Sequence, residues 1–264
     1  MKILLKIRFN GAAYCGFQAQ PDGRAVQNVL TAAFSDLFGF PCDITGCSRT
    51  DSGVHALGFC ATVAPHDVPY AEDWCPIPAG KIHRAVNTRL PDDIAVTAAA
   101  VIPDSFHPRY DVLSKEYEYR IYDTPCRDPF FDRLAYHSVR KITDESVYRM
   151  NECAALFCGR QNFASFMATG SKITDPVRTV YAASVSRDND GLIRYRVQAD
   201  GFLYNMVRIM TGTLLEAAYG TRTPQQITDA LRTGDRRLAG FTAPPCGLYL
   251  SHVTYNRDIQ WLCD

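Results

Sequence analysis

The segment Gly46–Ala56 gathers residue types that could carry out chemistry into one short polar loop. It reads Gly-Cys-Ser-Arg-Thr-Asp-Ser-Gly-Val-His-Ala and lies between two apolar stretches. Asp51 offers a carboxylate that could act as a nucleophile or as an acid–base group, and Arg49 offers a cation beside it. Functional residues concentrate on loops that a rigid scaffold positions. The loop is therefore the first candidate for an active site.

Two other interpretations of Asp51-Ser52-Gly53 stay open at this point. The triplet could belong to an aspartic protease, whose two carboxylates share a proton. Such an enzyme would have to be a homodimer, because the sequence holds no second Asp-Ser/Thr-Gly, and Arg49 and Thr50 stand where apolar residues are usual. The triplet could also be a structural turn in which Asp51 caps its own backbone.

The patterns around the loop predict an α+β module. Residues 2–9 alternate as a strand, residues 26–37 carry apolar side chains at helical spacing before Gly39, and residues 57–63 form an apolar strand. A helix at 81–90 and a strand at 94–102 follow. These elements place the polar loop after the helix at 26–37 and directly before the strand at 57–63.

Two prolines within residues 102–108 predict a domain boundary near residue 105, which divides the chain into 1–105 and 106–264. The second part, like the first, is predicted to contain both strands and helices. Strands are predicted at 115–122, 177–185, 193–199 and 248–255, and helices at 144–158 after Thr143, at 203–219, and from Thr223-Pro224 with a capping box.

Composition restricts the function further. The chain has 264 residues, 47% of them hydrophobic, which is enough for a full core. No apolar run is long enough to span a membrane, and a cytoplasmic protein is expected. Lys plus Arg and Asp plus Glu both number 28, so a nucleic-acid partner would have to be held by a local basic patch.

Cysteine and histidine spacing gives no sign of a metal or a disulfide framework. The ten cysteines are scattered without a Cys-x-x-Cys pair, so they are expected to be reduced and to pack as small hydrophobes. The six histidines lack ligand spacing. No metal and no cofactor are predicted.

Gly46–Gly58 resembles the Gly-Arg-Thr-Asp-x-Gly-Val-His-Ala loop of the TruA-type tRNA pseudouridine synthases. The similarity runs nearly end to end, through Tyr14–Gln20 with Arg24–Gln27, Phe106–Tyr110, Lys115–Tyr119, Phe163–Phe166, Gly201–Arg208 and Gly247–Leu250. Ser48 departs from the pattern, because it replaces a glycine that would permit a positive φ.

The resemblance implies roles for four residues. Asp51 would be the nucleophile or acid–base group, Tyr117 would stack on the target base, and Arg49 and Arg208 would be the basic partners around Asp51. A guanidinium such as that of Arg208 would keep the carboxylate ionised in a pocket that excludes water. Tyr117 could instead be core, because it shares a strand face with Tyr119 and Ile121.

Other residues would bind RNA or pack. Arg24 and Arg109 are expected to contact substrate phosphates, as are Lys172 and Arg178. Phe202 and Tyr204 are expected to be packing residues.

As a whole, the resemblance implies an α+β pseudouridine synthase fold. Two similar halves would form an extended, mostly antiparallel sheet flanked by helices, with Asp51 in the cleft between them. The implied activity is isomerisation of uridine in the anticodon stem-loop of tRNA, at positions 38 to 40, by a homodimer. A non-catalytic RNA-binding or chaperone module is the first alternative, and a homodimeric aspartic protease is the second.

Overall fold

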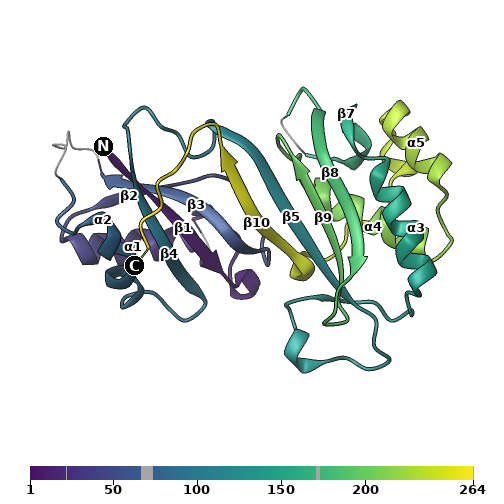
Figure 1. The fold of residues 1–264 in the computed structure, drawn as a ribbon, viewed down its shortest axis with the longest axis horizontal. Helices are drawn as coiled ribbons and strands as arrows, with labels where there is room; N and C mark the ends of the chain where they lie inside the picture. The colour runs from purple at the N-terminus through teal and green to yellow at the C-terminus, as the bar shows by residue number, and fades with distance from the viewer. Residues whose placement is uncertain (22, 67–73, 171–172, 264) are drawn as a thin grey trace. The chain divides into compact units, whose positions relative to one another are not determined.

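The computed structural model describes residues 1–21, 23–66, 74–170 and 173–263. It has an α+β architecture with a large, mixed, mostly antiparallel sheet (Figure 1). The chain forms two compact units: unit 1 is Met1–Leu113 together with the segment from Leu250, and unit 2 is Ser114–Tyr249. The positions of the two units relative to one another are not determined. The domain boundary at residue 105 stays a prediction.

The strands of unit 1 follow the order β4-β1-β3-β10, and β1 is antiparallel to both β3 and β4. The central β1 (Lys2–Phe9) pairs on one side with β3 (His55–Pro65) and on the other with β4 (Ile94–Ile102). A short strand, β2 (Cys42–Gly46), pairs with β3. The last strand, β10 (Leu248–Tyr255), belongs to unit 1 from its third residue onward.

Two helices cover the strands of unit 1. The first, α1 (Val26–Phe38), lies against β2, and α2 (Ala79–Asn87) lies against β4. α1 ends at Gly39, which adopts a φ of +78° and donates its N–H to Ser35 O. Because a side chain disfavours this left-handed conformation, glycine is the natural stop. The helix predicted before Gly39 is confirmed.

Unit 2 has the strand order β5-β9-β8-β7, with β6 parallel to β5. The strands are β5 (Val112–Tyr122), β6 (Tyr136–His137), β7 (Gly159–Asn162), β8 (Val177–Arg187) and β9 (Ile193–Ala199). The helices are α3 (Asp144–Ala155), α4 (Met206–Ala218) and α5 (Pro224–Thr233). Short 3₁₀ helices in the chain span Gly11–Ala13, Pro129–Phe131, Ala164–Phe166, Arg236–Leu238 and Pro245–Gly247.

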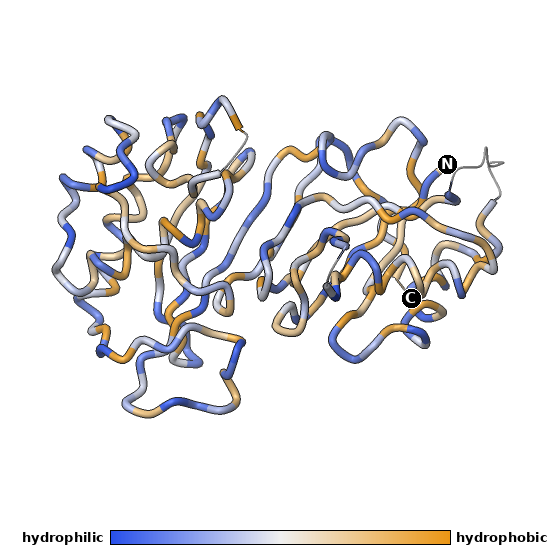
Figure 2. Tube along the Cα trace, turned by 180° about the vertical axis from the view of Figure 1, so that it is seen from behind, coloured by the Kyte–Doolittle hydropathy of each residue, from blue (hydrophilic) through white to orange (hydrophobic). Residues whose placement is uncertain are grey.

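The strands of unit 2 have one apolar face. Tyr117 lies opposite Val197 and Tyr119 opposite Tyr195, and all four are buried. The Tyr195 hydroxyl lies 3.8 Å from Met210 Sδ, which places α4 on this face. In Figure 2, hydrophobic residues recur along strands and helices, whereas the connecting loops are mostly hydrophilic. The period-two pattern of β5 and β9 therefore gives the core of unit 2.

Sequence signals predicted the first residues of two helices of unit 2 correctly and that of a third incorrectly. Thr143 caps α3, and Thr223 with Gln226 forms the predicted capping box of α5. The helix expected from residue 203 begins at Met206 instead, because Asn205 adopts the left-handed conformation. The short strands β2, β6 and β7 were not predicted.

All ten cysteines are free thiols. Burial raises the pKa of the Cys42 thiol to about 11, so this side chain stays protonated at neutral pH. No helix within the described parts of the chain is long and apolar enough to cross a membrane.

Candidate active site

Asp51 lies in a tight turn between β2 and β3. The turn is closed by the N–H of Val54, which donates to Asp51 O at 3.2 Å. The next two residues are fixed by one carbonyl, since Ser52 Oγ and the N–H of Gly53 both donate to Tyr14 O at 3.2 Å. Gly53 has a φ of +78°. The turn is thus held by a segment that lies 38 residues earlier in the chain.

That segment approaches the turn closely because two of its residues are glycines. A Cβ on Gly16 would lie 2.4 Å from Thr50 O, and a Cβ on Gly11 would lie 1.9 Å from Val54 O. Gly16 also has a φ of +104°. The N–H of Phe17 donates to Thr50 O at 3.4 Å. We call residues 11–17 the clamp, because they closely approach Thr50 and Val54 on the two sides of Asp51.

Two polar contacts hold the clamp, one at its first residue, Gly11, and one at Tyr14. The buried His55 accepts the N–H of Gly11 at Nδ1, 3.1 Å away, so this nitrogen carries no proton. The Tyr14 hydroxyl donates to Asp93 at 2.5 Å. Burial and this hydrogen bond raise the pKa of Tyr14 well above its ordinary value. The guanidinium of Arg24 lies over the Tyr14 ring, 4.7 Å from its centroid.

Ser48 does not need the backbone freedom of the glycine that it replaces. Within the described residues, the non-glycine residues with positive φ are Arg133 and Asn205. The loop therefore accommodates serine without strain at this position.

Tyr117 lies on β5 in unit 2 and is buried, with 6% of its surface exposed. Its ring meets Phe202 edge to face, with centroids 5.0 Å apart and planes at 85°. Phe202 is therefore a packing residue, as predicted. Tyr204 is not, because half of its surface is exposed.

Arg208 lies in the first turn of α4, where two groups orient its guanidinium. Nε donates to Ala243 O at 2.8 Å, and Nη1 donates to Asn205 Oδ1 at 2.6 Å. Asn205 precedes the helix with φ 59° and ψ 11°. The expectation that an arginine in this apolar stretch needs partners is met within unit 2. Its pairing with Asp51 stays a prediction, because Asp51 belongs to unit 1.

Arg49 and Arg109 come together in unit 1, where both line one pocket of about 200 Å³. Both side chains are exposed. His107 and Tyr110 line the same pocket. Sequence reasoning named both arginines but did not place them side by side.

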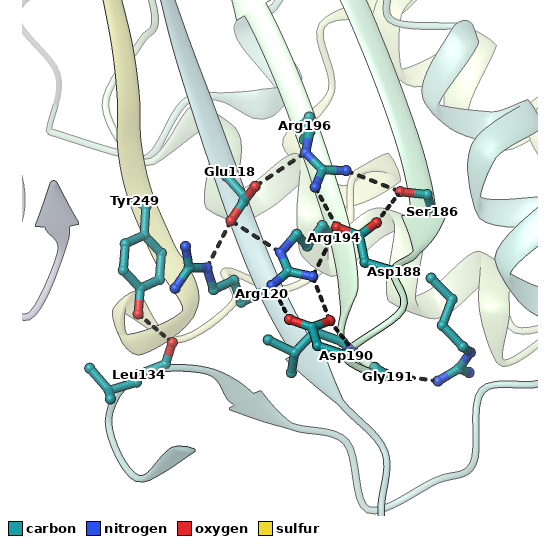
Figure 3. Close-up of polar contacts among 12 residues, drawn as sticks. Glu118, Arg120, Leu134, Ser186, Asp188, Asp190, Gly191, Arg194, Arg196 and Tyr249 are labelled. Carbon is teal, nitrogen blue, oxygen red and sulfur yellow. Dashed lines mark hydrogen bonds and ion pairs between the residues drawn. The ribbon is translucent and has the colours of Figure 1, made fainter. Parts of the chain in front are cut away.

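Arginines of unit 2 have a different environment, which Figure 3 shows. Arg194 and Arg196 share Glu118 and Asp188, with Nη2 of Arg196 2.6 Å from Asp188 Oδ2. The hydrogen bond from Arg194 lowers the pKa of Asp190 to about 2. This network joins three arginines to three carboxylates: Arg120, Arg194, Arg196, Glu118, Asp188 and Asp190. Its cations are already neutralised by protein groups.

Two further basic residues were expected to contact phosphate. Arg178 donates Nη1 to the backbone carbonyls of Asp175 at 3.1 Å and of Val177 at 2.5 Å, so part of its donor capacity is used internally. Lys172 lies outside the described residues. Among the residues that the structure does describe, no group of three His, Cys, Asp or Glu side chains is placed to hold a metal ion.

Sequence reasoning assigned no role to the clamp or to Asn205, although the motifs Tyr14–Gln20 and Gly201–Arg208 overlap them. Glycine at positions 11 and 16 is compatible with close backbone approach, but nothing in the sequence indicates that the Asp51 loop is the segment approached. Asn205 gave no signal, because asparagine is common in loops for several reasons.

Comparison with known proteins identifies the family. Residues 6–111 and 153–256 match the family model described as tRNA pseudouridine synthase. A tRNA pseudouridine synthase A from Syntrophotalea carbinolica is 39% identical over 254 residues, which cover 96% of each chain. The protein of the same name from Bacillus subtilis is 39% identical over 258 residues, covering 97% of this chain and all of the other. These matches argue against an aspartic protease or a non-catalytic RNA-binding module, and they show that this chain belongs to the TruA family of tRNA pseudouridine synthases, which are isomerases.

Proposed function

We propose that this enzyme isomerises uridine to pseudouridine at positions 38 to 40 in the anticodon stem-loop of tRNA, with Asp51 as its nucleophile or acid–base group. The observation that carries the proposal is the clamped turn of Asp51. Hydrogen bonds and two close glycine approaches fix the backbone of the turn that carries this carboxylate, in a chain of this family.

The reaction requires only internal transfer of atoms. The bond between ribose C1′ and uracil N1 breaks, a bond between C1′ and C5 forms, and the proton lost from C5 is balanced by one gained at N1. A fixed carboxylate can attack the ribose or the base, or can accept a proton. The base must stay in the site throughout, which demands a stacking surface and an exclusion of water.

The remaining roles follow from this chemistry. Tyr117 stacks on the extruded uracil, and Arg208 pairs with Asp51 and keeps it ionised. Arg49 is the second basic partner of the Asp51 turn. Arg24, held over Tyr14 at the clamp, and Arg109 contact the RNA backbone. These assignments supply charge, stacking and phosphate contacts without a cofactor or a metal.

The enzyme acts as a cytoplasmic homodimer in this proposal, so that basic residues of both subunits follow the tRNA backbone. Sedimentation of the free enzyme at assay concentration checks this part. A monomer that is fully active would contradict it.

The test is modification of tRNA lacking the product, taken from a strain in which the gene is deleted. The wild type should form pseudouridine at positions 38 to 40, mapped nucleotide by nucleotide. Asp51→Asn should lower the rate at least about 100-fold, because the amide keeps the shape of the carboxylate but loses its charge and basicity. Circular dichroism should show an unchanged fold.

The matched control is Asp36→Asn, which changes an exposed aspartate on α1 in the same unit. This variant should modify tRNA at the wild-type rate. Turnover of Asp51→Asn near the wild-type rate would refute its catalytic role. Modification elsewhere in tRNA would refute the proposed positions while leaving the enzyme class intact.

A further inference from the structure

The pocket that Arg49 and Arg109 line has the properties of a ligand site. Its volume is about 200 Å³, and all of its lining residues belong to unit 1. Gln18 and Ser48 supply further polar groups at its wall. Phe17 of the clamp also lines the pocket and donates its N–H to Thr50 O, so the pocket adjoins the clamped turn.

The two guanidiniums are available to a ligand. Within the described parts of the chain, the guanidinium of neither Arg49 nor Arg109 makes an ion pair or a hydrogen bond, and the backbone N–H of Arg109 donates to His107 Nδ1 at 3.1 Å. This contrasts with Arg194, which contacts Glu118, Asp188 and Asp190. Two exposed guanidiniums at one pocket favour an anion, and their planar donors match the oxygens of a phosphate.

An aromatic pair forms another wall of the pocket. The rings of His107 and Tyr110 lie with centroids 4.2 Å apart and planes at 34°. Tyr110 is 75% exposed. A large exposed aromatic ring next to two cations is the combination that binds a nucleobase together with its phosphate.

The turn that carries these rings is fixed before any ligand binds. Asp111 Oδ2 accepts the N–H of His107 at 2.9 Å, and His107 O accepts the N–H of Asp111 at 3.1 Å. The Tyr255 hydroxyl donates to Pro108 O at 3.0 Å, and its ring packs on the buried Phe106. A ligand would therefore find the platform already ordered, and little conformational entropy would be lost on binding.

The volume indicates how much of a ligand enters. Sites for free small molecules usually measure roughly 300 to 1,000 Å³. The smaller pocket here suits one nucleotide of a polymer whose remaining length lies outside. Single-stranded RNA binds in this manner, base by base on aromatic rings.

We infer that this pocket binds an unpaired nucleotide of the RNA substrate next to the target uridine, with Arg49 and Arg109 on its phosphate and Tyr110, backed by His107, stacked on its base. The inference rests on the proposed function, because it requires an RNA strand that passes the Asp51 turn. It adds a second base-binding site to the one assigned to Tyr117. The site is sequence-tolerant, since any base can stack.

Tyr110→Ala and Tyr110→Phe test the stacking, because so exposed a residue can be changed without loss of fold. Binding of tRNA is measured in the Asp51→Asn background, and kcat and KM in the wild-type background. Tyr110→Ala should raise Kd and KM about 5- to 150-fold with kcat changed less than about 3-fold, whereas Tyr110→Phe should match the parent. Unchanged Kd in Tyr110→Ala would overturn the stacking site.

An abasic nucleotide identifies the occupant. It is placed singly on either side of the uridine that the wild type modifies. At one position, the abasic change should weaken binding to the wild-type ring but not to Tyr110→Ala, because the contact is already lost. Equal losses in both proteins at every position would contradict the assignment.

Salt dependence tests the phosphate contact. Arg109→Gln should reduce the slope of log Kd against log salt by about 0.7 to 0.9. Arg8→Gln, which removes an exposed charge from β1 outside the pocket, should leave the slope unchanged. Equal slopes for the two variants would refute the phosphate contact. Modification by the wild type outside positions 38 to 40 would refute the proposed positions and would leave these binding results valid.

Discussion

Arg208 is oriented by a residue whose backbone conformation few side chains adopt. Asn205 has a φ of 59°, where β-carbon contacts cost most residues about 1 to 2 kcal/mol and asparagine less. Its Oδ1 lies 2.6 Å from Arg208 Nη1. Glycine would adopt this left-handed conformation at least as easily. The backbone therefore does not explain the asparagine, and its side-chain contact with Arg208 does. Asn205 is therefore a positioning residue for Arg208.

Asn205→Gly and Asn205→Asp separate the two functions of this residue. Glycine keeps the left-handed turn but removes the acceptor, so kcat should fall about 10- to 150-fold, the value of a hydrogen bond to a charged group. Aspartate keeps both the acceptor and a tolerable backbone, so activity should stay within a few-fold of the wild type. Thermal unfolding should show that Asn205→Gly is as stable as the parent.

The contrary result is equally clear. If Asn205→Gly works at the wild-type rate, the asparagine serves only the backbone, and its contact with Arg208 is incidental to catalysis.

Tyr117 is a residue for which packing and catalysis predict different variants. Its edge-to-face contact with Phe202 contributes about 0.5 to 1.5 kcal/mol to stability, and base stacking contributes about 1 to 3 kcal/mol to substrate binding. Tyr117→Leu should therefore lower kcat/KM more than it lowers stability, and Tyr117→Phe should preserve both binding and fold. The measurements are kinetics corrected for folded protein and melting temperature.

A purely structural Tyr117 would behave otherwise. Tyr117→Leu would then melt at a lower temperature while its folded fraction retained full activity.

At the level of elements, long periodic segments were predictable and short ones were not. The strands β1 and β9 have the bounds expected from alternation, and β4 and β10 also have their predicted bounds. β2 has five residues, of which only Cys42 and Ile44 are buried, so its period-two signal is too short to detect between Gly39 and the polar loop. β7 consists of Gly-Arg-Gln-Asn and is mostly exposed, so nothing in its composition indicates a strand.

The predicted first residue of α4 was wrong for a different reason. Apolar periodicity extends from residue 203, but the left-handed Asn205 interrupts the helical backbone. Periodicity reports which face is buried and not where the backbone changes conformation.

One part of the candidate site was likewise predictable from the sequence and another part was not. The Asp51 loop was found because arginine, aspartate and glycine are unusual together between apolar strands. The clamp was not found, because its contacts join residues 11–17 to residues 50–55 through backbone atoms that carry no sequence signature. The pocket at Tyr110 depends on the same kind of long-range approach.

On the scale of the whole molecule, a net charge of zero conceals an uneven distribution of charge. In unit 2, Arg194 and Arg196 form ion pairs with Glu118, whereas Arg49 and Arg109 in unit 1 are exposed. A neutral protein can thus present a local basic surface to RNA.

The ion pairs of unit 2 also affect how stable this unit is in acid. Four aspartates of unit 2 have a lowered pKa: Asp123, Asp188, Asp190 and Asp235. Asp123 is the most buried, with 4% of its side chain exposed. Burial raises its pKa, but hydrogen bonds from Arg187 and from the N–H of Ile142 outweigh burial and lower it.

A carboxyl group whose pKa is lower in the folded state stabilises that state above its unfolded pKa of about 3.9. This contribution is lost as the pH falls through the folded value. With the pKa of Asp190 at about 2, the loss extends from about pH 4 down to about pH 2. Unit 2 should therefore lose stability in this window.

Acid titration should consequently unfold unit 2 before unit 1. Both tryptophans, Trp74 and Trp261, lie in unit 1, so their fluorescence reports that unit alone, whereas far-ultraviolet circular dichroism reports both. Below about pH 4, circular dichroism should decline at a higher pH than the fluorescence changes. Asp123→Asn should be less stable at pH 7 by the order of 3 kcal/mol, since Arg187 loses its carboxylate, and should lose less on acidification. Coincident transitions in the wild type, unaltered by Asp123→Asn, would show that these carboxylates do not set the acid stability of unit 2.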